Sequence, residues 1–146
     1  MNIIMFTNTF APHLGGVAHS VEWLAQSLKN IGHQVLVVAP DYSGAPQIEP
    51  GVIRIPAIQN FNGTDFSVPL PFSKPLERVL DSFAPDLVHS HHPFLLGHSA
   101  LRVAAARSLP VVFTYHTRYE MYGHYVARDS AALKRLVRSL ALGYCD

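Results

Sequence analysis

Charged side chains are scarce in this sequence: Asp, Glu, Lys and Arg make up 14% of its 146 residues, against about 25% in typical soluble chains. Hydrophobic residue types reach 49%, a composition that predicts a large buried core and excludes an intrinsically disordered chain. The one cysteine, Cys145, excludes an internal disulfide framework. The sequence also lacks an apolar run near the ~20 residues of a membrane-spanning helix, and a basic leader of the secretory type. We therefore expect one cytoplasmic, globular α/β domain.

The formal net charge is +1, too small to favour nucleic acid as a partner, because such binding depends on many phosphate contacts. The charge is unevenly distributed: residues 1–85 carry four basic and six acidic side chains, whereas residues 86–146 carry seven basic and four acidic ones. Most of the basic excess comes from Arg118, Arg128, Lys134, Arg135 and Arg138. Either a solvated helix face or an anionic partner, such as a phosphate or a membrane surface, explains this excess.

Short apolar runs at regular spacing predict the strands of a parallel sheet. The runs cover residues 2–7, 34–39, 52–56, 86–91 and 110–116. Helical segments separate most of these runs, and such connections form right-handed crossovers. We therefore predict an α/β fold, a doubly wound, Rossmann-like parallel sheet with helices on both faces.

Four segments carry the apolar spacing of amphipathic helices. In the first segment the stripe consists of Val17, Val21, Leu24, Leu28 and Ile31, and Gly32 ends the helix. The other helices are expected at 76–83, at 95–109, where Leu101, Ala104 and Ala105 would face the core, and at 133–144. Residues 57–72 contain Asn, Gly, Pro and Phe without a clear period, and we predict a long loop there.

Polar side chains and glycines cluster where three of the predicted strands end. The first strand leads to His13, Gly15 and Gly16, the fourth to His89, His91 and His92, and the fifth to His116, Tyr119 and Glu120. The carboxyl ends of parallel strands meet at one edge of a sheet, which is where doubly wound sheets bind ligands. The sequence therefore predicts a ligand site at this edge.

Gly15 and Gly16 directly precede the first predicted helix. Because glycines lack Cβ atoms, their backbone can approach a ligand closely, and the N–H groups of a helix N-terminus favour a phosphate. The alternative is a turn that requires a positive φ. The pair is not the G-x-G-x-x-G fingerprint of dinucleotide-binding proteins.

The histidines at the end of the fourth strand raise the question of a metal. His89 and His91 are expected on the same side of the strand, so they could share a zinc or iron ion. A metal site also favours a carboxylate or thiolate, yet no Asp or Glu occurs between Asp86 and Glu120. The alternatives are imidazoles that line a polar pocket and imidazoles with a structural role alone.

Residues 114–125 hold four Tyr, two His, one Arg and one Glu. Aromatic rings with hydroxyls beside a few charges are typical of sites for polyhydroxylated ligands, and His116 at the strand end is the favoured functional residue.

The sequence lacks a G-x-S-x-G elbow and a G-x-x-x-x-G-K-[ST] loop, and Cys145 has no neighbouring base. These absences argue against nucleophilic hydrolases and NTPases.

Four segments in order resemble the N-terminal domain of family-4 retaining glycosyltransferases, which have the GT-B fold. They read I-I-M-F-T-N-T-F-A-P-H-L-G-G-V-A, G-H-Q-V-L-V-V-A, D-L-V-H-S-H and P-V-V-F-T-Y-H-T. A further segment, Y-H-T-R-Y-E-M-Y-G-H-Y, resembles the branch that glucosylates membrane diacylglycerol lipids. The resemblance runs through the whole chain.

The resemblance implies transfer of a sugar from a nucleotide-diphosphate donor to a hydroxyl acceptor, with a membrane glycerolipid as one candidate acceptor. It places Gly15 and Gly16 against the donor diphosphate. It gives His116 a bond to the donor sugar and a part in stabilising the transition state, not the role of nucleophile. The acceptor side is assigned to His91, His92, Tyr119 and Glu120. No metal and no other cofactor is expected.

Enzymes of this family have two Rossmann-like domains, and the second holds most of the nucleotide-sugar site, including a Glu-x7-Glu element. Residues 1–146 correspond to the N-terminal, acceptor-side domain, so we expect a truncated chain that is inactive without its C-terminal domain. In the lipid branch, Lys134, Arg135 and Arg138 would lie on one side of a helix whose other side is apolar. This pattern is typical of peripheral contact with an anionic membrane surface, and the lipid branch implies the inner face of the membrane. The alternative is a helix whose apolar side packs into its own domain.

Two other functions stay open at this stage. One is a metal-dependent hydrolase that uses His89, His91 and His116, which predicts stoichiometric metal in the purified chain. The other is a non-catalytic domain that binds sugars or anionic membranes.

Overall fold

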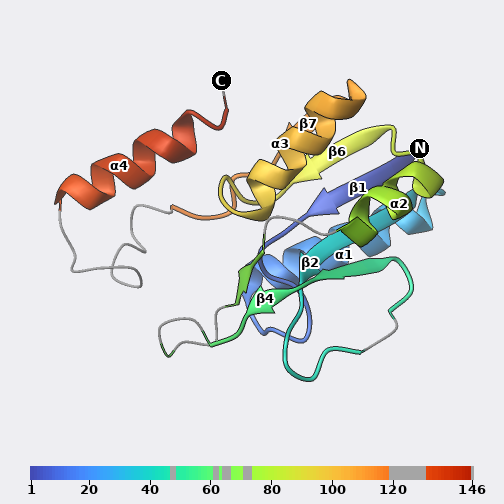
Figure 1. Ribbon diagram of the computed structural model, residues 1–146, viewed down its shortest axis with the longest axis horizontal. Helices are drawn as coiled ribbons and strands as arrows, with labels where there is room; N and C mark the ends of the chain where they lie inside the picture. The colour runs from blue at the N-terminus through green and yellow to red at the C-terminus, as the bar shows by residue number, and fades with distance from the viewer. Residues whose placement is uncertain (47–48, 61–62, 64–66, 71–73, 119–130, 146) are drawn as a thin grey trace.

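The computed structural model of the chain describes residues 1–46, 49–60, 63, 67–70, 74–118 and 131–145 (Figure 1). In chain order, its elements are β1 (Asn2–Phe6), α1 (Gly16–Asn30), β2 (Gln34–Pro40), β3 (Val52–Ile55), β4 (Ala57–Ile58), β5 (Val68–Pro69), α2 (Lys74–Phe83), β6 (Leu87–Ser90), α3 (Leu96–Arg107), β7 (Val111–Phe113) and α4 (Ala131–Leu142). Helices separate β1 from β2, β5 from β6 and β6 from β7, as the sequence predicts, whereas β2, β3, β4 and β5 follow one another in the order of elements.

The main sheet has five parallel strands in the order β3-β2-β1-β6-β7 (Figure 1). β1 is the central strand, and its Ile4 pairs with Leu36 of β2 on one side and with Val88 of β6 on the other. The strand order reverses at β1. The chain first adds β2 and β3 on one side of β1, and it then crosses to the other side, where β6 and β7 follow. The predicted doubly wound parallel sheet is confirmed.

Successive side chains of β1 point to opposite faces of the sheet, so the core has two layers. Ile4 and Phe6 are fully buried against the face that α2 and α3 cover, whereas Ile3 and Met5 face α1 and contact Val21. Burying each large aliphatic or aromatic side chain of this kind contributes about 1.5–3 kcal/mol. A sheet covered on both faces explains the low share of charged residues, and it holds the strand ends in fixed positions.

The segment predicted as one long loop, residues 57–72, contains a small second sheet instead. β4 and β5 pair antiparallel, with Ala57 opposite Pro69 and Ile58 opposite Val68. Each strand has only two residues, so no alternating pattern can develop in the sequence. The loop prediction was therefore wrong for these residues.

Several predicted core positions also differ from the structure. Ile31 is 71% exposed because α1 ends at Asn30, and Ala105 is exposed while Leu101 is half-buried. The buried positions of α1 include Ala18 and Ala25, and small side chains occupy the places where a helix lies closest to the sheet. Gly32 has φ 91° and ends the helix as predicted.

α4 projects away from the sheet and approaches the rest of the domain only near its C-terminal end (Figure 1). Ala141 is fully buried there, and the Tyr144 hydroxyl lies 2.7 Å from Ser90 Oγ. Along the predicted stripe, Leu136 and Leu140 are 56% and 55% exposed, while the side chain of Leu133 lies outside the described residues. Within the described part of the chain, no helix is long and apolar enough to span a membrane.

Candidate functional site

The carboxyl ends of β1, β6 and β7 lie together at one edge of the sheet, and backbone hydrogen bonds continue past the strands. The His91 N–H donates to the Phe6 carbonyl (2.9 Å), and the Thr114 N–H donates to the Ser90 carbonyl (3.0 Å). These bonds hold residues 89–92 beside residues 114–116. The predicted convergence of strand ends is therefore confirmed for β1, β6 and β7.

Three imidazole rings from the two neighbouring segments form a stack. The ring centroids of His89 and His91 are 4.1 Å apart, and those of His91 and His116 are 5.1 Å apart. His91 Nδ1 lies 2.9 Å from His116 Nε2, and His89 Nε2 lies 2.8 Å from Thr114 Oγ1. His89 and His91 share one side of β6, as predicted.

The histidine cluster is electrically neutral at physiological pH. Burial, with a smaller contribution from neighbouring imidazoles, lowers the pKa of His89 to about 4, of His92 to about 3 and of His91 to about 2. Burial also lowers the pKa of His116. A neutral imidazole has one N–H and one lone pair, so each ring can donate one hydrogen bond and accept one.

Asn8 joins the loop after β1 to the loop after β6. Its backbone N–H donates to His92 Nδ1 (3.1 Å), so the proton of neutral His92 is on Nε2. The Asn8 side chain donates to the Phe94 carbonyl (3.0 Å) and accepts from the Leu96 N–H (3.1 Å) at the start of α3. His92 is thereby fixed next to His116, at 6.5 Å between ring centroids.

Gly15 and Gly16 lie at the N-terminus of α1, and their own conformation does not require glycine. Gly15 has φ 179° and ψ 155°, an extended backbone open to any residue, and Gly16 is not among the positive-φ positions. A Cβ on Gly16 would meet no atom within 4 Å, and one on Gly15 would meet His13 Nε2 at 3.5 Å, an ordinary contact. The turn alternative is therefore not supported, and the open backbone is accessible to a ligand.

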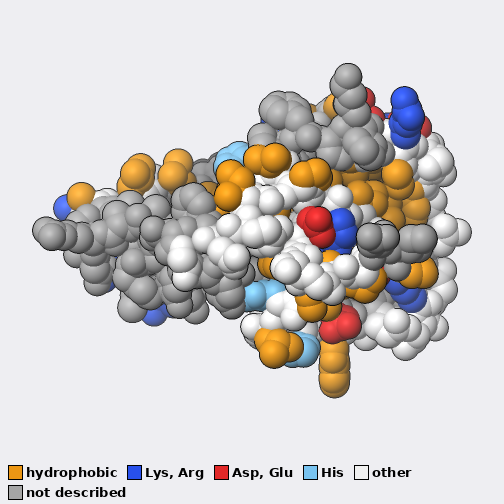
Figure 2. Space-filling model, turned by 60° about the horizontal axis from the view of Figure 1, so that its bottom comes forward, with side chains coloured by type: hydrophobic (Ala, Val, Ile, Leu, Met, Phe, Trp, Pro, Cys, Tyr) orange, Lys and Arg blue, Asp and Glu red, His pale blue; other side chains and the backbone are white. Residues whose placement is uncertain are grey.

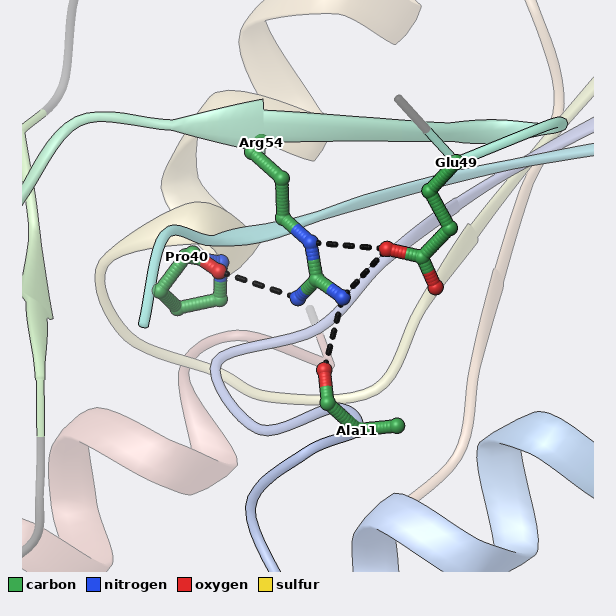
Figure 3. Close-up of polar contacts among 4 residues, drawn as sticks. All are labelled: Ala11, Pro40, Glu49 and Arg54. Atoms are coloured by element: carbon green, nitrogen blue, oxygen red, sulfur yellow. Dashed lines mark hydrogen bonds and ion pairs between the residues drawn. The ribbon is translucent and has the colours of Figure 1, made fainter. Parts of the chain in front are cut away.

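Arg54 at the end of β3 anchors the loop that carries these glycines (Figure 3). Its guanidinium donates to the Ala11 carbonyl (2.7 Å), to the Pro40 carbonyl (3.2 Å) and to the Glu49 carboxylate. It also lies over the Phe10 ring at 5.6 Å from the centroid. One cation thus ties the loop after β1 to the end of β2 and to β3.

The other predicted site residues have different outcomes. His13 stacks on Tyr42 at 5.8 Å, and the Tyr42 hydroxyl donates to the Asn8 carbonyl (2.9 Å), so His13 belongs to the same edge. Tyr119 and Glu120 lie outside the described residues.

The three predicted basic residues occupy α4. Lys134 is half-buried, whereas Arg135 and Arg138 are exposed. These residues are separate from the histidine cluster in the sequence. Among the described residues, the segment that follows α4 contacts that edge through Tyr144.

The described residues contain no group of three or more His, Cys, Asp or Glu side chains that could hold a metal ion. His89 Nε2 pairs with Thr114, and His91 Nδ1 pairs with His116. The arrangement favours a polar, hydrogen-bonded wall over a metal centre.

The sequence analysis missed Asn8, Arg54, Gly97 and Tyr144 as site-forming residues. A Cβ on Gly97 would lie 1.8 Å from the His92 carbonyl oxygen, so only glycine lets α3 begin against that loop. The Tyr144 hydroxyl donates to the Gly97 carbonyl oxygen at 2.9 Å and so packs against the start of α3. A glycine inside a predicted helix was the one available signal for Gly97. For the other three, Arg54 reaches Ala11 over 43 residues, Tyr144 reaches Ser90 over 54, and Asn8 reaches Leu96 over 88.

Comparison with known proteins identifies related chains. The model of Glycosyltransferase Family 4 matches residues 14–146. An alpha-monoglucosyldiacylglycerol synthase of Streptococcus pneumoniae is 33% identical over 146 residues, which cover 99% of this chain and 33% of the relative. The synthase of the same name from Acholeplasma laidlawii is 36% identical over 131 residues, or 88% of this chain and 33% of the relative. A GDP-mannose-dependent alpha-mannosyltransferase of Mycolicibacterium smegmatis is 34% identical over 142 residues, or 90% of this chain and 37% of the relative.

We predict that Arg54→Met lowers the free energy of unfolding by about 2–4 kcal/mol, because it leaves the Glu49 charge without its guanidinium and two carbonyls without their donor. Urea denaturation measures this. Arg107→Met is the matched control: its ion pair with Asp81 has side-chain exposures of 30% and 69%, so its removal should cost less than about 1 kcal/mol. Equal losses in the two variants would contradict the anchoring role of Arg54.

We also predict that stability falls with acidification below pH 6.5. In the unfolded chain His89, His91 and His92 take up protons near the ordinary histidine pKa of 6.5, whereas in the folded chain they do not until pH 4 or below. Each histidine can therefore remove about 1.4 kcal/mol per pH unit in this window, with no such dependence above it. Urea midpoints from pH 8 to about pH 5 measure the slope.

His89→Asn should reduce the loss of unfolding free energy per pH unit below pH 6.5, since it removes one of the three buried imidazoles. His19→Gln on the exposed surface of α1 keeps all three and is the control. A wild-type curve that stays flat down to about pH 5 would show that the histidines are not held neutral by the fold.

Proposed function

Because the chain belongs to glycosyltransferase family 4, we propose that it forms the acceptor-side half of a retaining glycosyltransferase. The observation that carries the proposal is that the neutral histidine cluster and the loop with the open glycine backbone both follow strands at the carboxyl edge of a doubly wound sheet. In the reaction, the bond between the anomeric carbon and the donor phosphate breaks. A bond from the acceptor hydroxyl oxygen to the same carbon forms, and the hydroxyl proton leaves with the diphosphate.

The residues at this edge suit that chemistry. The first N–H groups of α1, next to Gly15 and Gly16, would bind the donor diphosphate, since a helix N-terminus favours negative charge. His116 is half-buried at the end of β7 and would contact the donor sugar. A neutral imidazole hydrogen-bonds a hydroxyl without adding a charge, and a preorganised polar wall stabilises the charge that develops at the anomeric carbon.

The chain spans about a third of the length of the curated relatives it matches. We infer that residues 1–146 supply one wall of the active site and that a C-terminal domain supplies the other, with most of the donor site. The coding sequence downstream of codon 146 tests this directly: we expect an open frame of a second domain, and a stop codon there would favour a binding domain without activity.

A lipid acceptor is the finer part of the proposal, and α4 supports it. Leu136 and Leu140 share one exposed side of the helix, while Lys134 and Arg138 share another, since positions four apart lie on the same face. Figure 2 shows orange side chains along one edge of the projecting arm and blue ones at its tip and opposite edge. An exposed apolar stripe with basic side chains on the other face of the helix fits contact with the inner face of an anionic membrane.

We predict that His116→Ala lowers the rate of sugar transfer by about 100-fold or more, because one preorganised donor or acceptor at the reacting centre contributes about 3 kcal/mol. The assay follows nucleoside-diphosphate release from a panel of nucleotide sugars with glycerolipid acceptors, using the protein at the full length its gene encodes. His19→Ala, on the exposed face of α1, should keep the wild-type rate. Unchanged transfer in the His116 variant would remove this residue from the site.

For α4, we predict that the double variant Lys134→Glu/Arg138→Glu binds anionic vesicles at least about 30-fold more weakly than wild type, since each basic residue near such a surface contributes about 1 kcal/mol. Flotation with phosphatidylglycerol vesicles measures the binding. Lys29→Glu/Arg78→Glu makes the same change in net charge on α1 and α2 and is the control. If both variants bind like wild type, α4 does not contact the membrane.

A further inference from the structure

We propose that His91 is a positioning residue that acts through His116: it holds the His116 ring in place and determines which of its nitrogens carries the proton. The resemblance to known transferases assigns His91 to the acceptor side, but the structure points to this different task. The inference rests on the proposed function in one respect, that His116 contacts the donor sugar.

Burial separates the two histidines by role. The His91 side chain has an exposure of 0%, whereas His116 is half-buried at the edge of the sheet. A side chain with no accessible surface affects a ligand only through a group that reaches it. The 2.9 Å bond from His91 Nδ1 leads to His116, the imidazole of the stacked trio that follows the end of β7.

His91 is the rigid member of the pair. Its backbone N–H donates to the Phe6 carbonyl of the central strand, and its ring packs at 4.1 Å against that of His89, which is itself bonded to Thr114. His116 lies two residues beyond the last backbone hydrogen bond between β6 and the segment after β7, the bond from Thr114. The orientation of the His116 ring therefore depends on the His91 ring.

Proton counting shows how His91 sets the state of His116. Both rings are neutral, because burial lowers the pKa of each, so the Nδ1 to Nε2 bond contains a single proton. If His91 donates, His116 carries its proton on Nδ1; if His91 accepts, His116 carries it on Nε2. The proton position of His91 therefore fixes that of His116, and Nδ1 of His116 is the nitrogen that does not pair with His91.

The pairing matters for sugar transfer because a sugar hydroxyl must accept a hydrogen bond from a ring N–H but donate one to a ring lone pair. A ring that exchanged freely between its two forms would present the required one for only part of the time. In metal enzymes, a hydrogen-bond partner holds the imidazole ligand in the same way, and mutating that partner typically lowers metal affinity or activity by about 10- to 100-fold.

The test is nitrogen NMR of the protein labelled with 15N-histidine, at the full length its gene encodes. In wild type, we expect the two ring nitrogens of His116 to have widely separated shifts, as one fixed form requires. His91→Leu should move them toward an average. His91→Asn should keep them separated, since its amide occupies the place of Nδ1 and can pair with His116.

Activity gives the second measurement. We expect His91→Leu to lower kcat about 10- to 100-fold with little change in KM for the acceptor, and His91→Asn to stay within a few-fold of wild type. Averaged His116 shifts in wild type, or separated shifts in a folded His91→Leu variant, would overturn the inference. A wild-type protein that shows the expected shifts but transfers no sugar would instead contradict the proposed function alone.

Discussion

The parallel pairing of β1 with both β2 and β6 is the constraint on which the rest of the structure depends. Ile4 pairs with Leu36 of β2 on one side and with Val88 of β6 on the other, and its side chain is fully buried. Since all five strands run in the same direction, every loop that follows a strand must emerge at one edge. The glycine loop, the histidines after β6 and His116 after β7 meet there because of strand direction, not because of their distance in the sequence.

Desolvation then gives this edge its chemical character. Imidazoles placed among buried strands lose the water that would stabilise their charged form, so they stay neutral and bond to one another. Polar groups without charge suit a hydroxyl-rich ligand, whose many hydrogen bonds need directional donors and acceptors. Arg54 also brings a charge to this edge, but Glu49 neutralises it while the guanidinium anchors Ala11.

Sequence reasoning predicted what depends on local pattern and missed what depends on long-range contact. The runs around Ile4, Leu36 and Val88 predicted the parallel sheet, and the His–Ser–His–His segment led to the prediction of a ligand site at its carboxyl edge. The two-residue strands β4 and β5 carry no period, so they could not be found. Asn8, whose partners lie 34 to 88 residues away, could not be found either, because no spacing rule links such distant positions.

The measurement that tests the central claim most directly is the affinity of Gly16→Ala for a nucleoside diphosphate, determined by calorimetric titration of the protein at its full encoded length. A Cβ at Gly16 meets no protein atom within 4 Å, and alanine favours a helix, so the variant should be at least as stable as wild type. We predict that it binds about tenfold or more weakly, since the methyl group blocks a backbone N–H whose bond to a charged phosphate contributes about 1.5–3 kcal/mol. Unchanged affinity in a stable Gly16→Ala variant would contradict a donor site at this edge.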